Sequence, residues 1–299
     1  MLRFGLLGTG YWAAETQGAA LASHPDAEFV GVWGRDPDKA DALATRYGVR
    51  AYADVDALIA DVDAVAVALP PDVQADLAAR AAEAGRHLLL DKPLALSTVA
   101  ADRVVDAVER HGLASLVFFT NRFYGNVREF LAGAAANGQW HGARATMLAS
   151  IFQPGNPYGA SPWRRDKGGL WDVGPHALSI ILPVLGPVTQ VAAMDAPRDT
   201  VHLLLRHAAG ATSALTLSLN AAPAATAFEF VFYGEPGTVT VPAGKTTVAE
   251  AFGAAIGQLA ANVRAGTPQD PCDVRFGREV VAILEAAETA RRDAATVSI

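Results

Sequence analysis

Hydrophobic and polar positions follow a regular order over residues 1–121. Short apolar runs alternate with amphipathic stretches, and Gly or Pro punctuates most of the junctions. This alternation is typical of a parallel sheet that helices cover on both faces. The predicted strands are Arg3–Leu7, Glu28–Trp33, Ala64–Leu69, His87–Leu90 and Leu113–Phe119. The predicted helices are Tyr11–Ser23, Pro37–Tyr47, Pro71–Ala84 and Ser97–His111.

The pattern changes after residue 121. Strand-like stretches with alternating or mixed apolar positions then dominate, and turn signals such as Ala209-Gly210 adjoin several of them. We therefore expect two domains, an α/β domain at 1–121 and an α+β domain with an open, mostly antiparallel sheet at 122–299. The strands expected in the second domain are Arg144–Phe152, Val188–Met194, Thr200–His207, Thr212–Asn220, Thr226–Tyr233 and Thr238–Val241. The helices expected there are Asn126–Ala136, Ala249–Arg264 and Val274–Ala290.

Composition narrows the class of protein. The net charge is −7 and no basic block occurs, so we expect no nucleic-acid partner. No apolar run has the length of a membrane span, and Leu2–Leu7 is too short for a signal peptide, so we expect no membrane partner. The single Cys272 excludes an internal disulfide and favours the cytoplasm; we interpret it as an inert thiol. No His, Asp or Glu cluster has the spacing of metal ligands, so no metal is expected.

The first predicted strand ends in a glycine-rich turn that opens the first helix. Gly8 permits a tight turn, Gly10 lets the backbone approach a pyrophosphate, and Ala13 is small enough for close helix packing. The helix N-terminus adds a partial positive charge. The alternative is an ordinary glycine-rich turn between strand and helix. The residues predicted to contact a dinucleotide here are Gly8, Thr9, Gly10, Tyr11, Trp12 and Ala13.

Which dinucleotide binds depends on the end of the second strand. NAD enzymes usually carry an acidic residue there for the ribose 2′-hydroxyl, but this chain has Gly34 followed by Arg35. Arg35 could pair with a 2′-phosphate, so NADP is favoured, and NAD stays possible; the alternative is that Arg35 only stacks on adenine. Leu69, the last residue of the third predicted strand, and Pro70, which follows it, are further cofactor-binding candidates.

Two later segments carry candidate chemistry. Asp91-Lys92-Pro93 follows a predicted strand, at the edge of an α/β sheet where ligands bind, although Lys92 alone could be a solvated loop residue. Asp172 and His176 are four residues apart and would share a face of one helix. Pro175 fits poorly inside a helix, so the segment could instead be kinked or start afresh near Gly174.

Together these motifs resemble the Gfo/Idh/MocA family of glucose–fructose oxidoreductase and inositol dehydrogenase. The resemblance covers nearly the whole chain: the glycine turn, Asp91-Lys92-Pro93 for the family's Glu-Lys-Pro, Trp163-Arg164, and the segment 168–176. It implies a Rossmann domain, an open-sheet domain and pyridine-nucleotide oxidoreduction of sugars, polyols or related carbonyls. Trp163, Arg164 and Asp91 join the cofactor-binding candidates. The departures are Asp91 for Glu, Gln74 for a frequent His, and Ser179 for a second Asp.

The residues suit hydride transfer to or from a small-molecule substrate. His176 is the expected base, because imidazole titrates near neutral pH. Asp172 would orient the imidazole or bind a neighbouring hydroxyl, and Lys92 would stabilise the oxyanion and touch the nicotinamide ribose. We expect the reaction to need both domains. The alternatives are a hydrogen-bonded core histidine at 176 and, for the chain, a non-catalytic nucleotide or metabolite sensor. Arg122 could reach a ligand or form an ion pair.

The second sheet also predicts self-association. Phe228, Phe230 and Phe232 would lie on one strand face, with Val231 and Tyr233 on the other. A sheet that is apolar on both faces needs a cover on both. We therefore expect a homodimer or homotetramer that pairs this sheet with its copy.

Overall fold

The computed structural model describes all residues, 1–299, and the chain forms two compact units. The first unit contains Met1–Phe123 and Thr246–Arg278, and the second contains Tyr124–Lys245 and Glu279–Ile299. The chain thus enters the second unit close to the boundary expected after residue 121, but it returns to the first unit before it ends.

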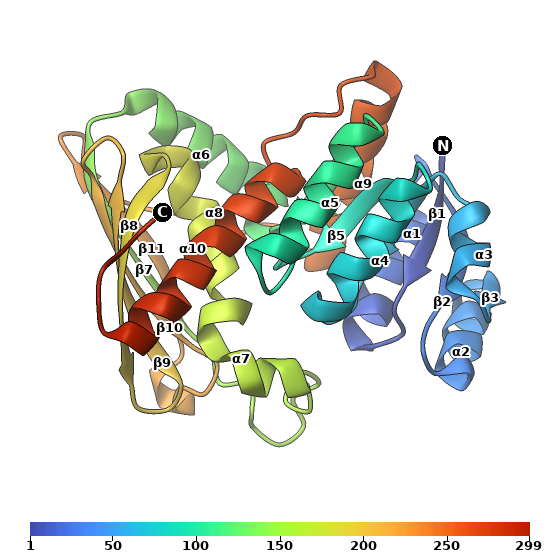
Figure 1. Cartoon of the computed structure of the whole chain (residues 1–299), viewed down its shortest axis with the longest axis horizontal. Helices are drawn as coiled ribbons and strands as arrows, with labels where there is room; N and C mark the ends of the chain where they lie inside the picture. The colour runs from blue at the N-terminus through green and yellow to red at the C-terminus, as the bar shows by residue number, and fades with distance from the viewer. The chain divides into compact units, whose positions relative to one another are not determined.

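The first unit is built on a parallel sheet with the strand order β3-β2-β1-β4-β5-β6. Figure 1 labels β1, β2, β3 and β5 of this sheet. All five predicted strands are present, with ends that differ by one to two residues. β3 has no predicted counterpart, because three residues are too few to show a periodicity. The strands are β1 (Leu2–Leu7), β2 (Ala27–Trp33), β3 (Arg50–Tyr52), β4 (Ala64–Val67), β5 (His87–Asp91) and β6 (Ser115–Phe118).

The four helices predicted for residues 1–121 are present, whereas the short helix at Val55–Ala60 and the 3₁₀ turn at Thr120–Phe123 have no predicted counterpart. Asp36 caps the N-terminus of α2 by accepting a hydrogen bond from Lys39 N, and Ser97 caps α5 in the same way through Ala100 N. Gly48 ends α2 with a left-handed φ of 65°. The helices are the π-helical η1 (Ala13–Gly18), α1 (Ala19–Ser23), α2 (Pro37–Tyr47), α3 (Val55–Ala60), α4 (Pro71–Glu83), α5 (Thr98–Arg110) and the 3₁₀ turn η2 (Thr120–Phe123).

The returning segment completes the core of the first unit. α9 (Val248–Ala265) packs against α1, β5, β6 and η2. Phe252 is fully buried, and its ring lies 4.9 Å from that of Phe118, edge to face. The backbone N–H of Val117 donates to the carbonyl of Cys272 at 2.7 Å. These contacts explain why Thr246–Arg278 belongs to the first unit although it follows the second in sequence.

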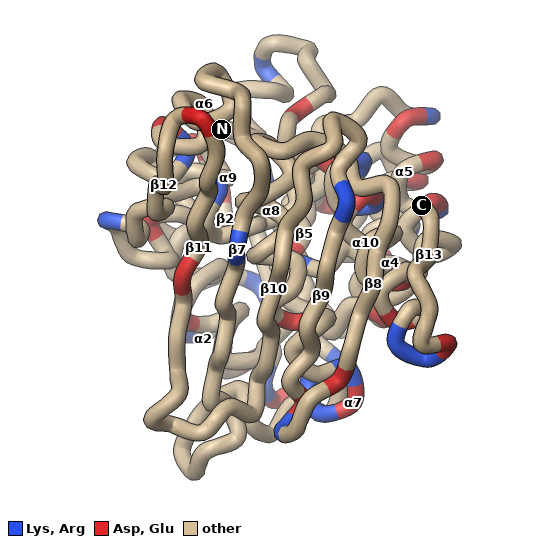
Figure 2. Tube along the Cα trace, turned by 90° about the vertical axis from the view of Figure 1, so that its left-hand side faces the viewer, with Lys and Arg blue, Asp and Glu red and all other residues tan.

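The second unit contains a mixed sheet with the order β12-β11-β7-β10-β9-β8-β13 (Figure 2). β10 and β7 are parallel, and the other pairs are antiparallel. This agrees with the open, mostly antiparallel sheet that the sequence predicts. The strands are β7 (Trp140–Leu148), β8 (Val188–Ala196), β9 (Thr200–His207), β10 (Thr212–Ser218), β11 (Ala227–Gly234), β12 (Gly237–Thr240) and β13 (Val297–Ser298).

One predicted strand is displaced. The prediction of Arg144–Phe152 is wrong at both ends, because β7 starts at Trp140 and stops at Leu148. Trp140 belongs to the strand through its pairing with Gly234, and beyond Leu148 only an isolated bridge between Ser150 and Asn220 continues the sheet. The apolar residues Ile151 and Phe152 imitate a strand but lie in turns.

Helices cover one face of this sheet. α8 packs on β7 and β10, and α6 packs on α8. The helices of the unit are α6 (Gly125–Asn137), α7 (Pro162–Asp172), α8 (Gly174–Leu185), the 3₁₀ turn η3 (Pro223–Ala225) and the end of α10 (Val274–Asp293). The stretch Pro162–Leu185 is long and apolar enough to cross a membrane by length and composition alone, but 78% of its apolar window is buried inside the fold. That burial is typical of a core helix.

The other face of the sheet is exposed. Burial alternates strictly along β9, where Val201, Leu203 and Leu205 are buried while Leu204 is 63% exposed. Met194 on β8 is 71% exposed. Few charged residues lie along the strands (Figure 2). We call this surface, formed by the exposed side chains of β8, β9 and β10, the outer face.

Candidate active site

The glycine turn between β1 and η1 has the geometry that a dinucleotide requires. Gly8 has a φ of 133°, and a Cβ there would lie 2.5 Å from the carbonyl oxygen of Ala68. Nothing lies within 4 Å of the position of a Cβ on Gly10, so the backbone is open to a ligand there. Ala13 is fully buried against the sheet. The residues present therefore fit a pyrophosphate at the turn.

The strand order places this turn at the point where ligands bind in open α/β sheets. β1 lies between β2 and β4, so the order reverses between β1 and β4. The carboxyl ends of β1, β4 and β5 are neighbours along one edge, because β4 pairs with both other strands in parallel. Leu69 and Pro70 follow β4, and Lys92 follows β5, at this same edge.

The end of β2 is more tightly packed than the sequence suggests. Gly34 lies against Thr9 of the glycine turn, and a Cβ at position 34 would lie 2.4 Å from Thr9 Cγ2. No side chain therefore fits at position 34 unless Thr9 moves. Arg35 is exposed beside it. The acidic residue typical of NAD enzymes is thus absent, and its place is closed by a neighbour.

The loop that carries Lys92 is held by the buried residue Gln74 of α4. Gln74 Oε1 accepts from the N–H of Asp91 at 2.9 Å, and Gln74 Nε2 donates to the carbonyl of Asp91 at 2.7 Å and to that of Pro93 at 3.0 Å. Asp91 Oδ1 accepts from the N–H of Lys92 at 2.7 Å, and the Lys92–Pro93 peptide bond is cis. Lys92 is half-buried. The sequence singles out Gln74 only as a departure from the family pattern.

Asp172 and His176 do not belong to one helix. Asp172 ends α7, and His176 lies in the first turn of α8, on the two sides of Val173. Pro175 supplies the reason, since it fits the first turn of a helix but not its interior. Asp172 is 8% exposed, and its Oδ2 lies 3.2 Å from Nε of Arg164. His176 is half-buried.

Arg164, in α7, is the centre of a small cluster that includes Tyr158 from the loop before this helix. Its guanidinium lies 4.8 Å from the ring of Trp163 and 5.1 Å from that of Tyr158. The structure thus brings Arg164, predicted as a cofactor contact, together with Asp172. Lys92 belongs to the first unit, whereas Asp172 and His176 belong to the second.

Asp199 is a second supporting residue, and no sequence motif identifies it. Asp199 Oδ2 accepts from the N–H of Gly169 at 3.2 Å, and Oδ1 accepts from Ser218 Oγ at 2.5 Å and from the N–H of Asn220 at 3.0 Å. Gly168 has a φ of 61° at a break inside α7. The carboxylate therefore fixes the start of the helical turn that ends at Asp172. In the sequence, Asp199 is recognisable only as a residue type that is common in turns, which does not predict its bond to Gly169.

The remaining candidates have mixed environments. The hydroxyl of Ser179 is fully buried and donates to the carbonyl of His176 at 2.8 Å. The guanidinium of Arg122 lies 5.5 Å from the ring of Phe276. Burial raises the pKa of Cys272 to about 12, which is the environment of an unreactive thiol. No group of three or more His, Cys, Asp or Glu side chains could hold a metal ion.

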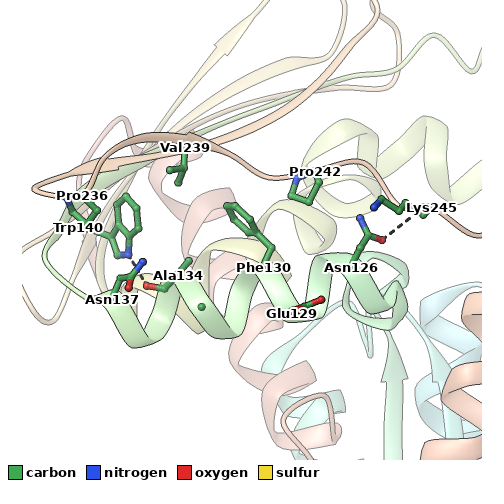
Figure 3. A pocket seen from close by; sticks show the side chains of 11 residues that line it. Asn126, Glu129, Phe130, Ala134, Asn137, Trp140, Pro236, Val239, Pro242 and Lys245 are labelled. Carbon is green, nitrogen blue, oxygen red and sulfur yellow. Dashed lines mark hydrogen bonds between the residues drawn. The ribbon is translucent and has the colours of Figure 1, made fainter.

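A groove of about 530 Å³ lies elsewhere in the second unit, between α6 and the segment that follows β12 (Figure 3). Phe130, Trp140 and Val239 form its apolar side. Trp140 Nε1 donates to the carbonyl of Ala134 at 2.7 Å, and Asn126 Nδ2 donates to that of Ala243 at 2.8 Å, so these polar groups serve the fold. None of the predicted site residues lines this groove.

Two family profiles match the chain. That of the "Oxidoreductase family, NAD-binding Rossmann fold" matches residues 2–119, and that of the "GFO/IDH/MocA C-terminal domain" matches residues 134–240. A dTDP-3,4-didehydro-2,6-dideoxy-alpha-D-glucose 3-reductase of Streptomyces antibioticus is 32% identical over 193 residues, which are 62% of this chain and 57% of that protein. A D-xylose 1-dehydrogenase (NADP(+)) of Haloferax volcanii is 32% identical over 64% of this chain and 60% of its own length.

The matched stretches span 34% to 59% of the length of such curated relatives as these sugar-nucleotide reductases and an oxidoreductase of Rhizobium meliloti. Among solved structures, the WlbA dehydrogenase from Bordetella pertussis, in complex with NADH and UDP-GlcNAcA, has a TM-score of 0.86 at 24% identity. It covers 100% of this chain, which in turn covers 98% of it, so the likeness extends over the whole fold. The chain belongs to the GFO/IDH/MocA family of oxidoreductases, with an NAD-binding Rossmann domain at its N-terminus.

Proposed function

We propose that this protein is an NAD(P)-dependent oxidoreductase that transfers hydride between a nicotinamide cofactor and a sugar, a polyol or a derived keto compound. The observation that carries the proposal is the open backbone at Gly10, in a turn where Gly8 is closely packed against Ala68. The names of the matched relatives, a sugar-nucleotide reductase and a xylose dehydrogenase, support a sugar-like substrate.

The cofactor, when bound, accepts or supplies the hydride. The chain must then handle one proton and the charge on one oxygen. We assign the proton to the imidazole of His176 and the stabilisation of the oxygen to the ammonium group of Lys92. Asp172 is assigned the orientation of the imidazole or of a substrate hydroxyl. Its ion pair with Arg164 supports this role, because it holds a buried carboxylate in one place.

For the cofactor we propose NADP in preference to NAD. Gly34 offers no carboxylate to a ribose 2′-hydroxyl, and Arg35 offers an exposed guanidinium to a 2′-phosphate. Gly8, Thr9, Gly10, Tyr11, Trp12, Ala13, Leu69, Pro70 and Asp91 complete the proposed cofactor contacts of the first unit. Trp163 and Arg164 are the proposed contacts from the second unit.

The test begins with fluorescence titration of NADPH and NADH, followed by turnover with a panel of polyols and keto-sugars. With a working substrate, His176→Ala should lower kcat by about 10²–10⁴ while cofactor affinity stays close to normal. Lys92→Ala should lower kcat and also weaken cofactor binding. The matched controls are His141→Ala and Lys39→Ala, since both of these side chains are mainly exposed in surface ion pairs.

Two outcomes would contradict the proposal. Near-normal turnover of both His176→Ala and Lys92→Ala would show that the assigned residues do not carry the reaction. Cofactor binding without turnover of any compound in the panel would favour a non-catalytic nucleotide or metabolite sensor.

The rate of oxidation by the unmodified enzyme should fall toward acid pH, because a protonated imidazole cannot accept the substrate proton.

We further propose that the protein is a cytoplasmic homodimer or homotetramer that associates through the outer face. Leu204 and Met194 expose apolar surface on the outer face, which a second copy could cover about a two-fold axis. Leu204→Glu should then reduce the mass measured by light scattering at micromolar protein. A monomer mass for the unmodified protein would rule this association out. The buried reduced thiol of Cys272 is compatible with the proposed compartment.

A further inference from the structure

We propose that Gln74 is a positioning residue that sets the place of the Lys92 ammonium group. This inference rests on the function proposed above, in which Lys92 acts on the substrate oxygen and the nicotinamide ribose. Gln74 is 1% exposed, so its side chain is buried inside the first unit. It would act through the backbone of the loop that carries Lys92.

The geometry is that of a clamp around one residue. Gln74 pairs with both backbone groups of Asp91, as a neighbouring strand would, and reaches past Lys92 to the carbonyls of Pro93 at 3.0 Å and Leu94 at 3.3 Å. Since Nε2 has only two N–H groups for three carbonyls, one of these bonds is shared. The Asp91–Lys92 and Pro93–Leu94 peptide groups, which lie on the two sides of the Lys92–Pro93 peptide, are thus held by the same side chain.

The amide is chemically specific for this task. It must accept from one N–H and donate to at least two carbonyls at the same time. An ionised glutamate could not donate, a methionine could not donate and accepts only weakly, and a neutral histidine could donate to one carbonyl only. Of these, only an amide satisfies every group that the loop directs at position 74.

Packing of α4 does not depend on this side chain. Ala78, Ala81 and Ala82 of α4 are fully buried and hold the helix against its neighbours. Gln74 lies in the first turn of α4, where Pro70 and Pro71 already set the backbone. A buried amide that the helix does not need, directed at the loop of Lys92, is better explained by the loop.

A double-mutant cycle separates positioning from general stability. We expect Gln74→Met to lower kcat and to raise the Kd of NADPH. The ratio of kcat to this Kd should fall by about 10- to 100-fold, since small misplacements of a reacting group have effects of this size. In a Lys92→Ala background, Gln74→Met should change kcat and NADPH affinity by less than about twofold further, because the ammonium group that it would misplace is already absent. Gln74→His, which keeps one donor and one acceptor, should recover part of the loss.

The control is a second buried glutamine of the same unit. Gln17 is fully buried and donates to the carbonyl of Val67 at 3.1 Å, with no bond to the Lys92 loop. Gln17→Met should therefore have the same effect in both backgrounds. Thermal unfolding of each variant shows whether it is folded, and Gln74→His carries the cycle if Gln74→Met does not fold.

The outcomes distinguish the two proposals. Equal losses from Gln74→Met with and without Lys92 would overturn the positioning role and leave the function intact. An unchanged kcat and NADPH affinity in Gln74→Met would overturn it as well. If Lys92→Ala itself changes neither kcat nor NADPH affinity, the assigned role of Lys92 fails first, and the role of Gln74 fails with it.

Discussion

The glycine turn at residues 8–13 and the segment at residues 168–176 both place candidate site residues, but they are built in different ways. The turn depends mainly on the small size of its own residues, since Gly8 has a positive φ close to Ala68 and Ala13 is fully buried. The segment owes its shape to Asp199, which binds Gly169 across a gap of 30 residues in the chain. A site residue can thus be positioned by local conformation or by a distant side chain, and the two respond differently to mutation.

The largest difference is expected within the glycine turn itself. Gly8→Val should prevent stable folding, because its Cβ would meet the carbonyl of Ala68 at 2.5 Å with an unfavourable φ. Gly10→Ala should fold with a normal Tm, since nothing lies within 4 Å of the new Cβ, yet weaken NADPH binding by about tenfold or more through contact with the phosphates. Calorimetry and NADPH titration measure the two effects. Loss of stability in Gly10→Ala would remove the contrast.

The distant support is tested at Asp199. Asp199→Ala removes a carboxylate that accepts several hydrogen bonds and should lower the free energy of unfolding by about 2–4 kcal/mol, the range for bonds to charged groups with partners left unpaired. The kcat of the folded variant should also fall, because the helical turn from Gly169 to Asp172 loses the hydrogen bond that fixes its start. Asp199→Asn keeps one acceptor and should lose less. Denaturant unfolding and kcat measured on both variants decide this, and full activity in Asp199→Ala would mean that Asp172 is held by other contacts.

A smaller effect, on cofactor affinity, is expected at Gly34 and Arg35, next to Thr9 of the glycine turn. Arg35→Ala should weaken NADPH by roughly 1.5–3 kcal/mol and leave NADH nearly unchanged. Gly34→Asp alone should weaken both cofactors, because the new Cβ displaces Thr9, whereas Thr9→Gly with Gly34→Asp should favour NADH. Isothermal titration with both cofactors tests each variant. Tighter binding of NADH than of NADPH by the unmodified protein would contradict the NADP assignment.

The smallest expected effect concerns the pH dependence of stability. His207 is 1% exposed and bonds Gly186 O at 2.8 Å and Ser213 Oγ at 2.9 Å, and burial lowers its pKa below 6.5. The unfolded chain then binds more protons than the folded one below about pH 6.5, so the stability contributed by neutral His207 is lost as pH falls. The Tm of the unmodified protein should therefore drop more between pH 7.5 and 5.5 than that of His207→Asn. Equal drops would show that His207 does not titrate differently on folding.

Local patterns explain why so much of the first unit could be predicted. Caps at Asp36 and Ser97, the stop at Gly48 and the buried strands all follow from neighbouring residues. Pro175 likewise indicates the break between the helices after Asp172. What could not be predicted depends on partners far along the chain: the contact of Thr9 with Gly34, the clamp by Gln74, and Asp199. Hydrogen bonds of this kind leave no periodicity, so residue type alone could not identify them.

The return of the chain to the first unit has a consequence for how the protein is made. On the ribosome, Met1–Phe123 emerges long before Thr246–Arg278, so the nascent Rossmann sheet lacks α9 during most of synthesis. Before Phe252 is synthesised, Phe118 lacks the ring that packs against it edge to face. Before Cys272 is synthesised, the N–H of Val117 in β6 lacks the carbonyl that it binds in the folded unit. The first unit can therefore be completed only after Thr246–Arg278 has been translated, and its contacts at β6 stay unmade until then.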